Sequence, residues 1–407
     1  MKRLAVLAVL ATLLVTGAAP ASATTADPPG AQAVVTWNRA LLGLLRTPGV
    51  QPATVHPTRS MAMMHLAMLD AAGVHRSHRH VHGTRRAAVA VAAHDVLVAL
   101  YPAQSATLDA LLDQELAAVT DPRARLKGRP AGALAAAKVL AARRGDGSDA
   151  TPPPYVTTGA PGDFQPVAAA AFTHWAAVRP FVLRRADEFR PAAPPALGSD
   201  AYAAALNEVQ ALGRSDSTVR SAEQTTIARF WSAAIQNYWN EIAQAVVLDE
   251  RMGVRRAARV FAVMDVAFAD SAIAFYDAKY HYRLWRPITA IRAADTDGNP
   301  ATVADATWAP LLNTPADPSY PGAHSVVAAA GAAVLAALTG SDRHALTVSS
   351  ESLPGVQRTF TSFSAARDEA GLSRLYAGVH YRFDDTAGQR LGEQVARVAL
   401  RRIGGAG

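Results

Sequence analysis

The chain of 407 residues contains no cysteine. Disulfide bonds therefore cannot stabilise the protein, even if it is exported to an oxidising compartment. Aromatic residues make up only 7% of the chain and charged residues 18%, whereas 50% of the residues are hydrophobic. Stability must then come from burial of a large apolar core, which a chain of this length can form as one large or two modest domains.

The N-terminus lacks an apolar run long enough to cross a bilayer. Residues 1–23 begin with Lys2 and Arg3, continue with an apolar run at 4–15 and end with small residues. This pattern is typical of a secretory signal, and the run is too short for a membrane span. We therefore expect a secreted protein, cleaved near Ala23, with no transmembrane span in the mature chain.

Acidic residues are fewer than basic ones. The chain has 33 Asp and Glu against 40 Lys and Arg, a net charge of +7, and loss of Lys2 and Arg3 with the signal lowers that charge by two. The sequence shows no compact basic run with interleaved aromatic residues, so we do not expect a nucleic-acid partner. An anion-binding site explains part of the positive charge.

Apolar residues recur at helical spacing in most of the chain, which predicts an all-α helical bundle. We expect an N-terminal helical region at 24–145, a Pro/Gly-rich connecting segment at 146–199 and a C-terminal bundle at 200–407. Proline and glycine clusters mark the connecting segment as loop structure. Its aromatic residues suggest that it packs across the surface rather than hanging free.

Within the C-terminal bundle, two stretches predict buried central helices. The stretch 254–283 is apolar on nearly all faces, and so is the shorter stretch 326–338. A third helix is expected over 221–250. Its aromatic residues, which include Phe230 and Trp239, are interpreted as core rather than as halide or substrate contacts.

The first of three polar segments ends the helix at 254–283. Lys279 and Arg286 lie seven residues apart, close to two helical turns, so on a helix they share a face. Pro287 then stops the helix and leaves Arg286 at its end. The pair predicts one cationic wall of an anion site.

The second segment reads Pro-Gly-Ala-His-Ser, and its proline suits the first turn of the helix that follows. We expect the backbone N–H groups of Gly322 and Ala323 to point out of this helix N-terminus, where an anion is favoured. Gly322 has no side chain, so an oxyanion could approach the backbone closely.

The third segment contains an arginine and a histidine–aspartate pair. Arg374 offers a bidentate fork for oxyanion oxygens. His380 precedes Asp384 by four residues, close enough for the carboxylate to hold one imidazole nitrogen and to raise the basicity of the ring.

Together the three segments resemble the three-part signature of the type-2 phosphatidic acid phosphatase / vanadium haloperoxidase superfamily. The chain has a lysine, six residues and Arg-Pro; then proline, two small residues and histidine; then Ser-Arg, five residues, histidine, three residues and aspartate. The resemblance implies an all-α bundle. Length, soluble character and a softer likeness in the connecting segment resemble the secreted bacterial haloperoxidase-like branch.

The resemblance also implies which residues hold the oxyanion. Lys279, Arg286 and Arg374 would bind it through their side chains. Backbone N–H groups at Gly322 and Ala323 would assist them.

Three further residues would carry the chemistry that the resemblance implies. His324 would be the acid/base. His380 would be the nucleophile toward phosphorus, or the residue that bonds the metal of vanadate directly, and Asp384 would orient it.

The second motif departs from the family pattern. The family usually has Pro-Ser-Gly-His, whereas this chain has Gly322 where the serine is expected. Ser325 and Ser319 are the two candidates to supply the missing hydroxyl. One lost neutral hydrogen bond is worth roughly 0.5–1.5 kcal/mol, so we expect a weakened site rather than an inactive one.

Three functions fit these residues. A vanadium-dependent haloperoxidase would hold vanadate as cofactor and oxidise a halide with hydrogen peroxide. A secreted acid phosphatase would need no cofactor and would hydrolyse a phosphomonoester through a phosphohistidine at His380. A non-catalytic oxyanion-binding protein is the third, although binding alone needs no paired acid/base equipment such as His324 and His380. The haloperoxidase is favoured.

Histidines outside these segments are interpreted as structural. His65 lies on an apolar helical stripe and is expected to pack in the core. A denser cluster could bind a metal, but interleaved arginines would repel a cation, so a solvated basic loop is preferred. The cluster consists of His75, His78, His80 and His82.

Overall fold

The computed structural model describes residues 30–73 and 81–404. The expected signal at 1–23 lies outside these residues, as do His75, His78 and His80, and the side chain of His82 is not described either. Within the described chain, no helix is long and apolar enough to cross a membrane.

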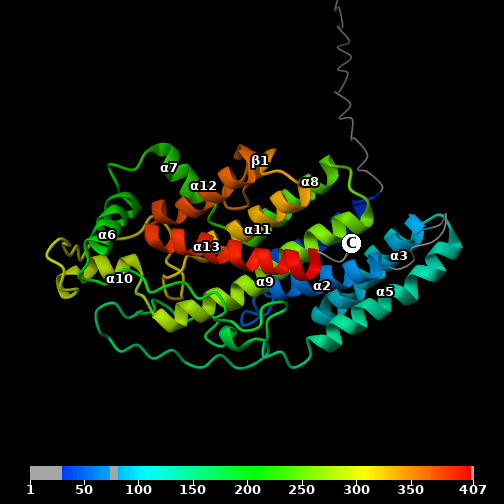
Figure 1. Ribbon diagram of the computed structural model, residues 1–407, viewed down its shortest axis with the longest axis horizontal. Helices are drawn as coiled ribbons and strands as arrows, with labels where there is room; N and C mark the ends of the chain where they lie inside the picture. The colour runs from blue at the N-terminus through cyan, green and yellow to red at the C-terminus, as the bar shows by residue number, and fades with distance from the viewer. Residues whose placement is uncertain (1–29, 74–80, 405–407) are drawn as a thin grey trace, which may run out of the picture.

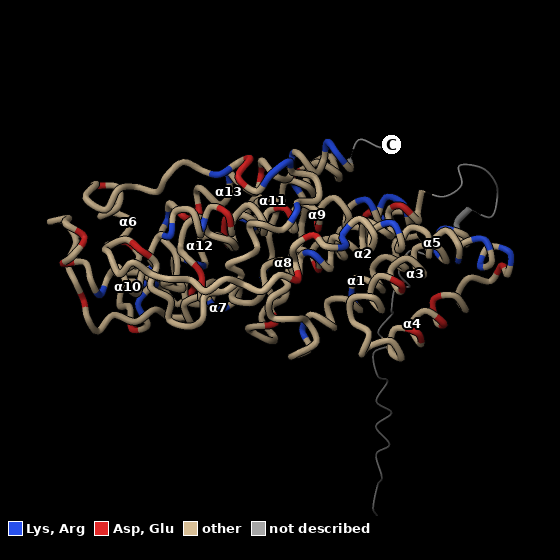
Figure 2. Tube along the Cα trace, turned by 90° about the horizontal axis from the view of Figure 1, so that it is seen from below, with Lys and Arg blue, Asp and Glu red and all other residues tan. Residues whose placement is uncertain are grey.

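The all-α prediction is confirmed, because α-helices form nearly all of the regular structure. The five described α-helices of the N-terminal region lie together at one end of an elongated molecule (Figure 1 and Figure 2). They are α1 (Gln32–Arg46), α2 (Pro57–Ala72), α3 (Val81–Leu100), α4 (Ser105–Ala117) and α5 (Pro122–Ala142).

The remaining helices form the bundle that carries the predicted site residues. They are α6 (Asp200–Gly213), α7 (Ala222–Phe230), α8 (Ile235–Asp249), α9 (Val254–Tyr282), α10 (Pro287–Arg292), α11 (Ala323–Thr339), α12 (Phe363–Tyr376) and α13 (Arg382–Ala399).

The long helix α9 joins the two ends of the molecule, as Figure 1 shows. Nearly every residue from Val254 to Lys279 on it is buried, which agrees with the predicted central helix. It packs against α2 of the N-terminal region and against α11 and α13 of the bundle. The helix ends at Arg283, whose left-handed φ of 54° turns the chain toward the site.

A buried polar network ties α9 to the N-terminal helices. His65 is fully buried, its Nδ1 lies 2.6 Å from Asp265 Oδ2, and its ring stacks on Phe261. Asn240 of α8 donates to Asp265 Oδ1 at 2.9 Å and accepts from Asn38 of α1 at 2.6 Å. The network fixes four helices in register, which agrees with the interpretation of His65 as a core residue.

Helices α11 and α13 approach closely because two glycines of α13 face α11. A Cβ on Gly392 would lie 2.0 Å from the carbonyl oxygen of Val326, and one on Gly388 would lie 2.7 Å from that of Gly322. Only hydrogen fits in these positions. The contact holds the start of α11 beside the start of α13.

The connecting segment packs across the surface, as expected. It contains only the short 3-10 helix η2 (Trp175–Ala177). Asp270 of α9 anchors it by accepting the backbone N–H groups of Phe181, Val182 and Leu183 at 2.6, 2.8 and 2.8 Å. Because three backbone donors converge on one buried carboxylate, this part of the segment follows α9 closely.

One local prediction was wrong, and one element was missed. The helix expected over 221–250 is broken between α7 and α8, where Trp231 donates its indole N–H to Glu369 at 2.9 Å. A short antiparallel hairpin of β1 (Arg343–Ser349) and β2 (Gln357–Ser362) was not predicted. Figure 2 shows Lys and Arg distributed along the whole length of the molecule, interspersed with Asp and Glu.

Candidate active site

Five helix ends bring the predicted site residues together. Lys279 lies in the last turn of α9, and Arg286 immediately precedes α10. His324 lies in the first turn of α11, Arg374 in the last turn of α12, and Asp384 in the first turn of α13. The sequence separates these residues widely, so only the bundle packing makes them neighbours.

Lys279 and Arg286 do not face an open anion site in this structure, because the loop before α11 engages them. Lys279 Nζ donates to the carbonyl oxygens of Pro318 and Ser319 at 2.5 and 3.2 Å. Arg286 donates from Nε to the carbonyl of Asp317 at 2.7 Å and from Nη2 to its carboxylate. Both cations are therefore held by one loop.

Asp317 is a buried carboxylate that sequence reasoning missed. Its Oδ2 lies 3.6 Å from Lys279 Nζ, and its Oδ1 accepts from Arg286. Burial alone would raise the pKa of Asp317, but Lys279 and Arg286 outweigh it and hold the pKa below its usual range. Burial in turn lowers the pKa of Lys279 to about 8, against the opposing charge of Asp317.

Arg374 differs from the other two cations because its donors lack acceptors. The residue is 6% exposed, and within the described chain its Nε and Nη1 atoms are buried without a hydrogen-bond partner. Burial and the charge of Arg286 lower its pKa to about 10, so it stays protonated at neutral pH. Buried, unpaired guanidinium donors are costly, and an oxyanion would satisfy them.

The predicted histidine–aspartate pair is formed. His380 Nδ1 lies 2.8 Å from Asp384 Oδ2, and the same oxygen accepts the Ser319 hydroxyl at 2.6 Å and the Tyr381 N–H at 3.1 Å. Burial raises the pKa of Asp384 to about 6, so it is ionised at neutral pH and can only accept. Arg286 Nη1 lies 3.0 Å from His380 Nε2. The ring therefore carries its proton on Nδ1 and a lone pair on Nε2.

His324 lies near this group, but no hydrogen bond joins it to the other predicted site residues within the described chain. Its Nε2 lies 3.1 Å from the carbonyl oxygen of Trp231. Burial and the charge of Arg374 lower the pKa of His324 well below its ordinary value, so the ring is neutral in this structure. The N–H on Nε2 therefore donates to the Trp231 carbonyl, which lies in the break between α7 and α8.

The backbone donor expected at Gly322 is not free. The Gly322 N–H donates to the carbonyl of Asp384 at 3.0 Å, which ties α11 to α13. Ser319 is also committed, since its hydroxyl donates to Asp384. Neither group is then available to an anion as placed here. Ser325 Oγ lies 3.4 Å from where a Cβ on Gly322 would stand, and it is hydrogen-bonded to the Asp385 carboxylate.

A further residue missed from the sequence is His56, which comes from the N-terminal region. Its ring packs among aromatic side chains, with centroids 5.2 Å from Phe172 and 5.9 Å from Tyr276. Burial lowers its pKa to about 4, while the charge of Asp317 acts in the opposite direction. No local motif around His56 signals this placement.

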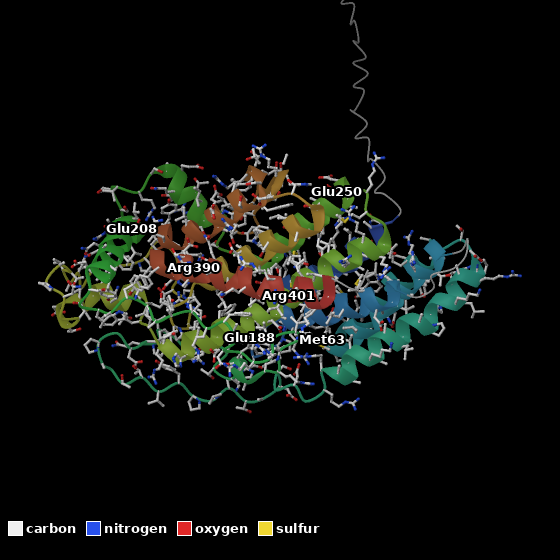
Figure 3. The ribbon with its side chains drawn as sticks, in the orientation of Figure 1. Met63, Glu188, Glu208, Glu250, Arg390 and Arg401 are labelled. Carbon is white, nitrogen blue, oxygen red and sulfur yellow. The ribbon has the colours of Figure 1, made fainter. Side chains whose placement is uncertain are left out.

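A groove of about 730 Å³ adjoins the loop at 317–321 that precedes α11, here called the site loop. Tyr320, between Ser319 and Pro321, lines it, and Glu208 of α6 and Arg390 of α13 (labelled in Figure 3) also contribute. Most of its other lining residues are alanine, proline and phenylalanine. Its volume is in the range of small-molecule pockets.

The chemistry of the donor set fits an oxyanion better than a bare cation. Among the described residues, no group of three or more His, Cys, Asp or Glu side chains could hold a metal ion. Three buried cations and one imidazole lone pair meet here instead. Vanadate fits such a set, since the arginines and the lysine can bind its oxygens and His380 Nε2 can bond its metal.

Known proteins resemble this chain in sequence. A family model described as the VCPO second helical-bundle domain matches residues 259–404. Vanadium chloroperoxidase from Curvularia inaequalis is 27% identical over 267 residues. That match spans 48% of this chain and only 43% of the relative.

Solved structures share the fold over nearly the whole chain. A bacterial vanadium-dependent iodoperoxidase superposes with a TM-score of 0.77 at 24% identity, covering 92% of this chain and 96% of its own. A holo-type bacterial vanadium-dependent chloroperoxidase gives 0.72 at 16% identity, covering 91% and 97%. The family-model match and the curated relative support the resemblance of this chain to vanadium haloperoxidases, and the solved structures show that it shares their fold.

Proposed function

We propose that the protein is an exported vanadium-dependent haloperoxidase-like enzyme that binds vanadate and oxidises a halide with hydrogen peroxide. The observation that carries the proposal is Arg374, whose buried Nε and Nη1 donors have no acceptor among the described residues. An anion that enters the site removes this cost. The named activities of the similar proteins favour vanadate as that anion.

Each cation has a distinct part in holding the anion. Arg374 would bind it first, because its donors are already unpaired. Lys279 and Arg286 would exchange contacts with the site loop for contacts with the anion oxygens. The low-dielectric surroundings strengthen these charge interactions, as in other preorganised sites.

His380 would bind the anion centre through Nε2. Its Nδ1–H is fixed by Asp384 at 2.8 Å, so the ring presents a lone pair without rotating or losing a proton. Burial and the charge of Arg286 lower the pKa of His380 well below its ordinary value, which keeps that lone pair unprotonated. Bound vanadate would supply activation of hydrogen peroxide for oxygen transfer to the halide.

His324 would move the proton. In this structure the ring is neutral, and its Nε2–H points to the Trp231 carbonyl. The negative charge of a bound oxyanion would favour the protonated ring, which could then give a proton to a departing oxygen. The acid/base role of His324, which the resemblance of the second segment implied, is part of this proposal.

The acid phosphatase is a second candidate because the same His380 lone pair suits attack on phosphorus. His380 Nε2 would form the bond to phosphorus while the ester oxygen leaves with a proton from His324. Water would then release phosphate and regenerate the ring. The non-catalytic oxyanion-binding protein needs only the cations.

One pair of assays on the mature protein separates the three functions. We expect oxidation of bromide, chloride or iodide that requires added orthovanadate and peroxide and that His380→Ala abolishes. Hydrolysis of p-nitrophenyl phosphate, inhibited by vanadate, would instead establish the phosphatase. If the protein shows neither activity but still binds vanadate, the result would support the non-catalytic oxyanion-binding function. His281→Ala, at an exposed histidine of α9, serves as the matched control and should leave the activity unchanged.

A further inference from the structure

Unpaired donors and a buried acceptor lie among the predicted site residues. Arg374 supplies buried N–H groups that have no acceptor within the described chain. Asp317 supplies a carboxylate that accepts from Arg286 Nη2, and Arg286 Nη1 in turn lies 3.0 Å from His380 Nε2. The charges of Asp317 and Arg286 both act on Arg374. A ligand that satisfies both must offer negative oxygens toward the arginine and a hydrogen-bond donor toward the carboxylate.

Asp317 is not free to turn away into solvent. The residue is 7% exposed, and its backbone carbonyl accepts from Arg286 Nε at 2.7 Å. Its carboxylate accepts from Arg286 Nη2 and lies 3.6 Å from Lys279 Nζ. The two cations that should bind the anion therefore also hold the carboxylate beside it.

Apart from Lys279, Arg286 and Arg374, the titratable groups that feel the charge of Asp317 offer it no cation. The ring of His56 feels this charge, but desolvation lowers its pKa to about 4, so it is neutral. Tyr276 and Tyr280 also feel that charge, and burial raises the pKa of both, so they stay uncharged. Asp317 thus remains an ionised acceptor held by Lys279 and Arg286.

An ionised carboxylate only accepts hydrogen bonds. Opposite a bare oxyanion oxygen it meets like charge at short range, which is unfavourable in a buried site. Opposite a hydroxyl of the same anion it accepts a strong, charge-assisted hydrogen bond. The interaction of the Asp317 carboxylate with an anion therefore depends on whether the anion carries a proton, and depends little on the size of the anion.

We propose that Asp317 is a specificity-determining residue that makes the pocket select oxyanions carrying a proton. Phosphate and vanadate retain at least one proton at neutral pH and fit this rule, whereas sulfate and molybdate carry none and are rejected. The inference rests on the proposed oxyanion pocket and deepens it. Sites built to pair with a substrate hydroxyl discriminate strongly, because the analogue leaves a buried polar group unpaired.

Calorimetric titration of the mature protein, without vanadate, tests the proposal with inorganic phosphate and sulfate. Molybdate, which is larger than phosphate, separates the effect of size from that of the proton. We expect phosphate to bind at least about tenfold more tightly than either of the other two anions. Equal affinity of the native protein for phosphate and sulfate overturns the proposal without any variant.

The variant Asp317→Asn keeps the shape of the side chain and removes its charge. We expect sulfate and molybdate to bind more tightly, so that the phosphate-to-sulfate affinity ratio falls by about tenfold or more. Asp297→Asn is the matched control. It alters another buried aspartate, whose carboxylate accepts from Thr302 at 2.9 Å, and should leave the ratio unchanged.

The outcomes separate this inference from the proposed function. An unchanged ratio in a folded Asp317→Asn protein overturns the assignment to Asp317. Anion discrimination that Asp317→Asn removes, in a protein that oxidises no halide, supports the inference and contradicts the haloperoxidase. A native protein that binds none of the three anions overturns both, since the pocket itself would then be wrong.

Discussion

Arg286 Nη1 lies 3.0 Å from Nε2 of His380, on the side of the ring opposite the nitrogen that contacts Asp384. An arginine can only donate, so the facing nitrogen of His380 must be the acceptor. The contact places a cation and a lone pair in the same small volume. A ligand that bonds His380 Nε2 would therefore meet Arg286 at once.

The Asp384 carboxylate should be essential for this arrangement. In Asp384→Asn the negative charge that fixes Nδ1–H of His380 is lost, and a neutral amide oxygen is a weaker acceptor for the three donors that share Oδ2. We expect kcat of the reaction that the protein performs to fall on the order of 10²- to 10⁴-fold. Steady-state kinetics at saturating vanadate, or at saturating phosphoester, measure the loss.

The neighbouring residue supplies the control for that prediction. Asp385 accepts from Gln389 at 3.2 Å and makes no contact with His380, so Asp385→Asn should retain most of the rate. A folded Asp384→Asn protein with the native kcat would contradict the role of the pair.

Much of this site could be predicted from the sequence because each segment carries its chemistry within a few residues. His380 and Asp384 are four residues apart, and their contact required only a local turn. Asp317 could not be predicted in the same way. It meets Arg286 across 31 residues of chain, and nothing in its own neighbourhood distinguishes it from a surface aspartate.

The errors in the predicted fold have the same origin. The stretch 221–250 has helical character throughout, but Trp231 turns out of the helix to reach Glu369, 138 residues away, and its carbonyl meets His324. The expected donor at Gly322 likewise depended on a helix N-terminus considered alone. In the bundle, α13 lies against that N-terminus, and Asp384 accepts the N–H.

Restoring the serine of the family motif should strengthen anion binding. A Cβ on Gly322 would lie 3.4 Å from Asp384 O and from Ser325 Oγ, which is ordinary contact, and the φ of −71° suits any residue. One added hydrogen bond of about 0.5–1.5 kcal/mol corresponds to a two- to tenfold gain in phosphate affinity. Calorimetric titration of Gly322→Ser measures it.

Gly322→Ala separates the hydroxyl from the added carbon. We expect this variant to fold like the native protein and to bind phosphate with unchanged affinity. If Gly322→Ser binds no more tightly than Gly322→Ala, the hydroxyl does not reach the anion, and Ser325 becomes the better candidate for that contact.

The connecting segment should make stability depend on pH. Asp163 accepts from Arg283 Nε at 2.8 Å and from the Thr158 N–H at 2.6 Å. Burial opposes ionisation, but these partners outweigh it and hold the pKa of Asp163 below its usual range. The ionised carboxylate therefore stabilises the fold above its ordinary pKa of about 4, and this contribution is lost as the pH falls toward the lower folded value.

The variant Asp163→Asn tests the direction of this pH dependence. We expect the variant to have a lower melting temperature than the native protein at neutral pH, and the gap to narrow as the pH is lowered through the acid range. Differential scanning calorimetry at a series of pH values measures the gap. A gap that stays constant, or that widens in acid, would show that the Asp163 charge does not stabilise this contact.

The close approach of α11 and α13 yields a prediction that links packing to the site. In Gly392→Ala the added methyl would stand 2.0 Å from Val326 O and 3.0 Å from Ala330 N, both backbone atoms that cannot rotate away. Helix α13 must shift, which should cost about 1–3 kcal/mol of unfolding free energy. Because Asp384 lies in the first turn of α13 and His324 in the first turn of α11, phosphate affinity should fall as well.

Gly43→Ala is the control, with an effect of opposite sign. No atom lies within 4 Å of its added methyl, so this α1 variant should gain about 0.4–1 kcal/mol of unfolding free energy. Equal melting temperatures for the two variants would mean that α13 does not need a glycine to place Asp384 beside α11.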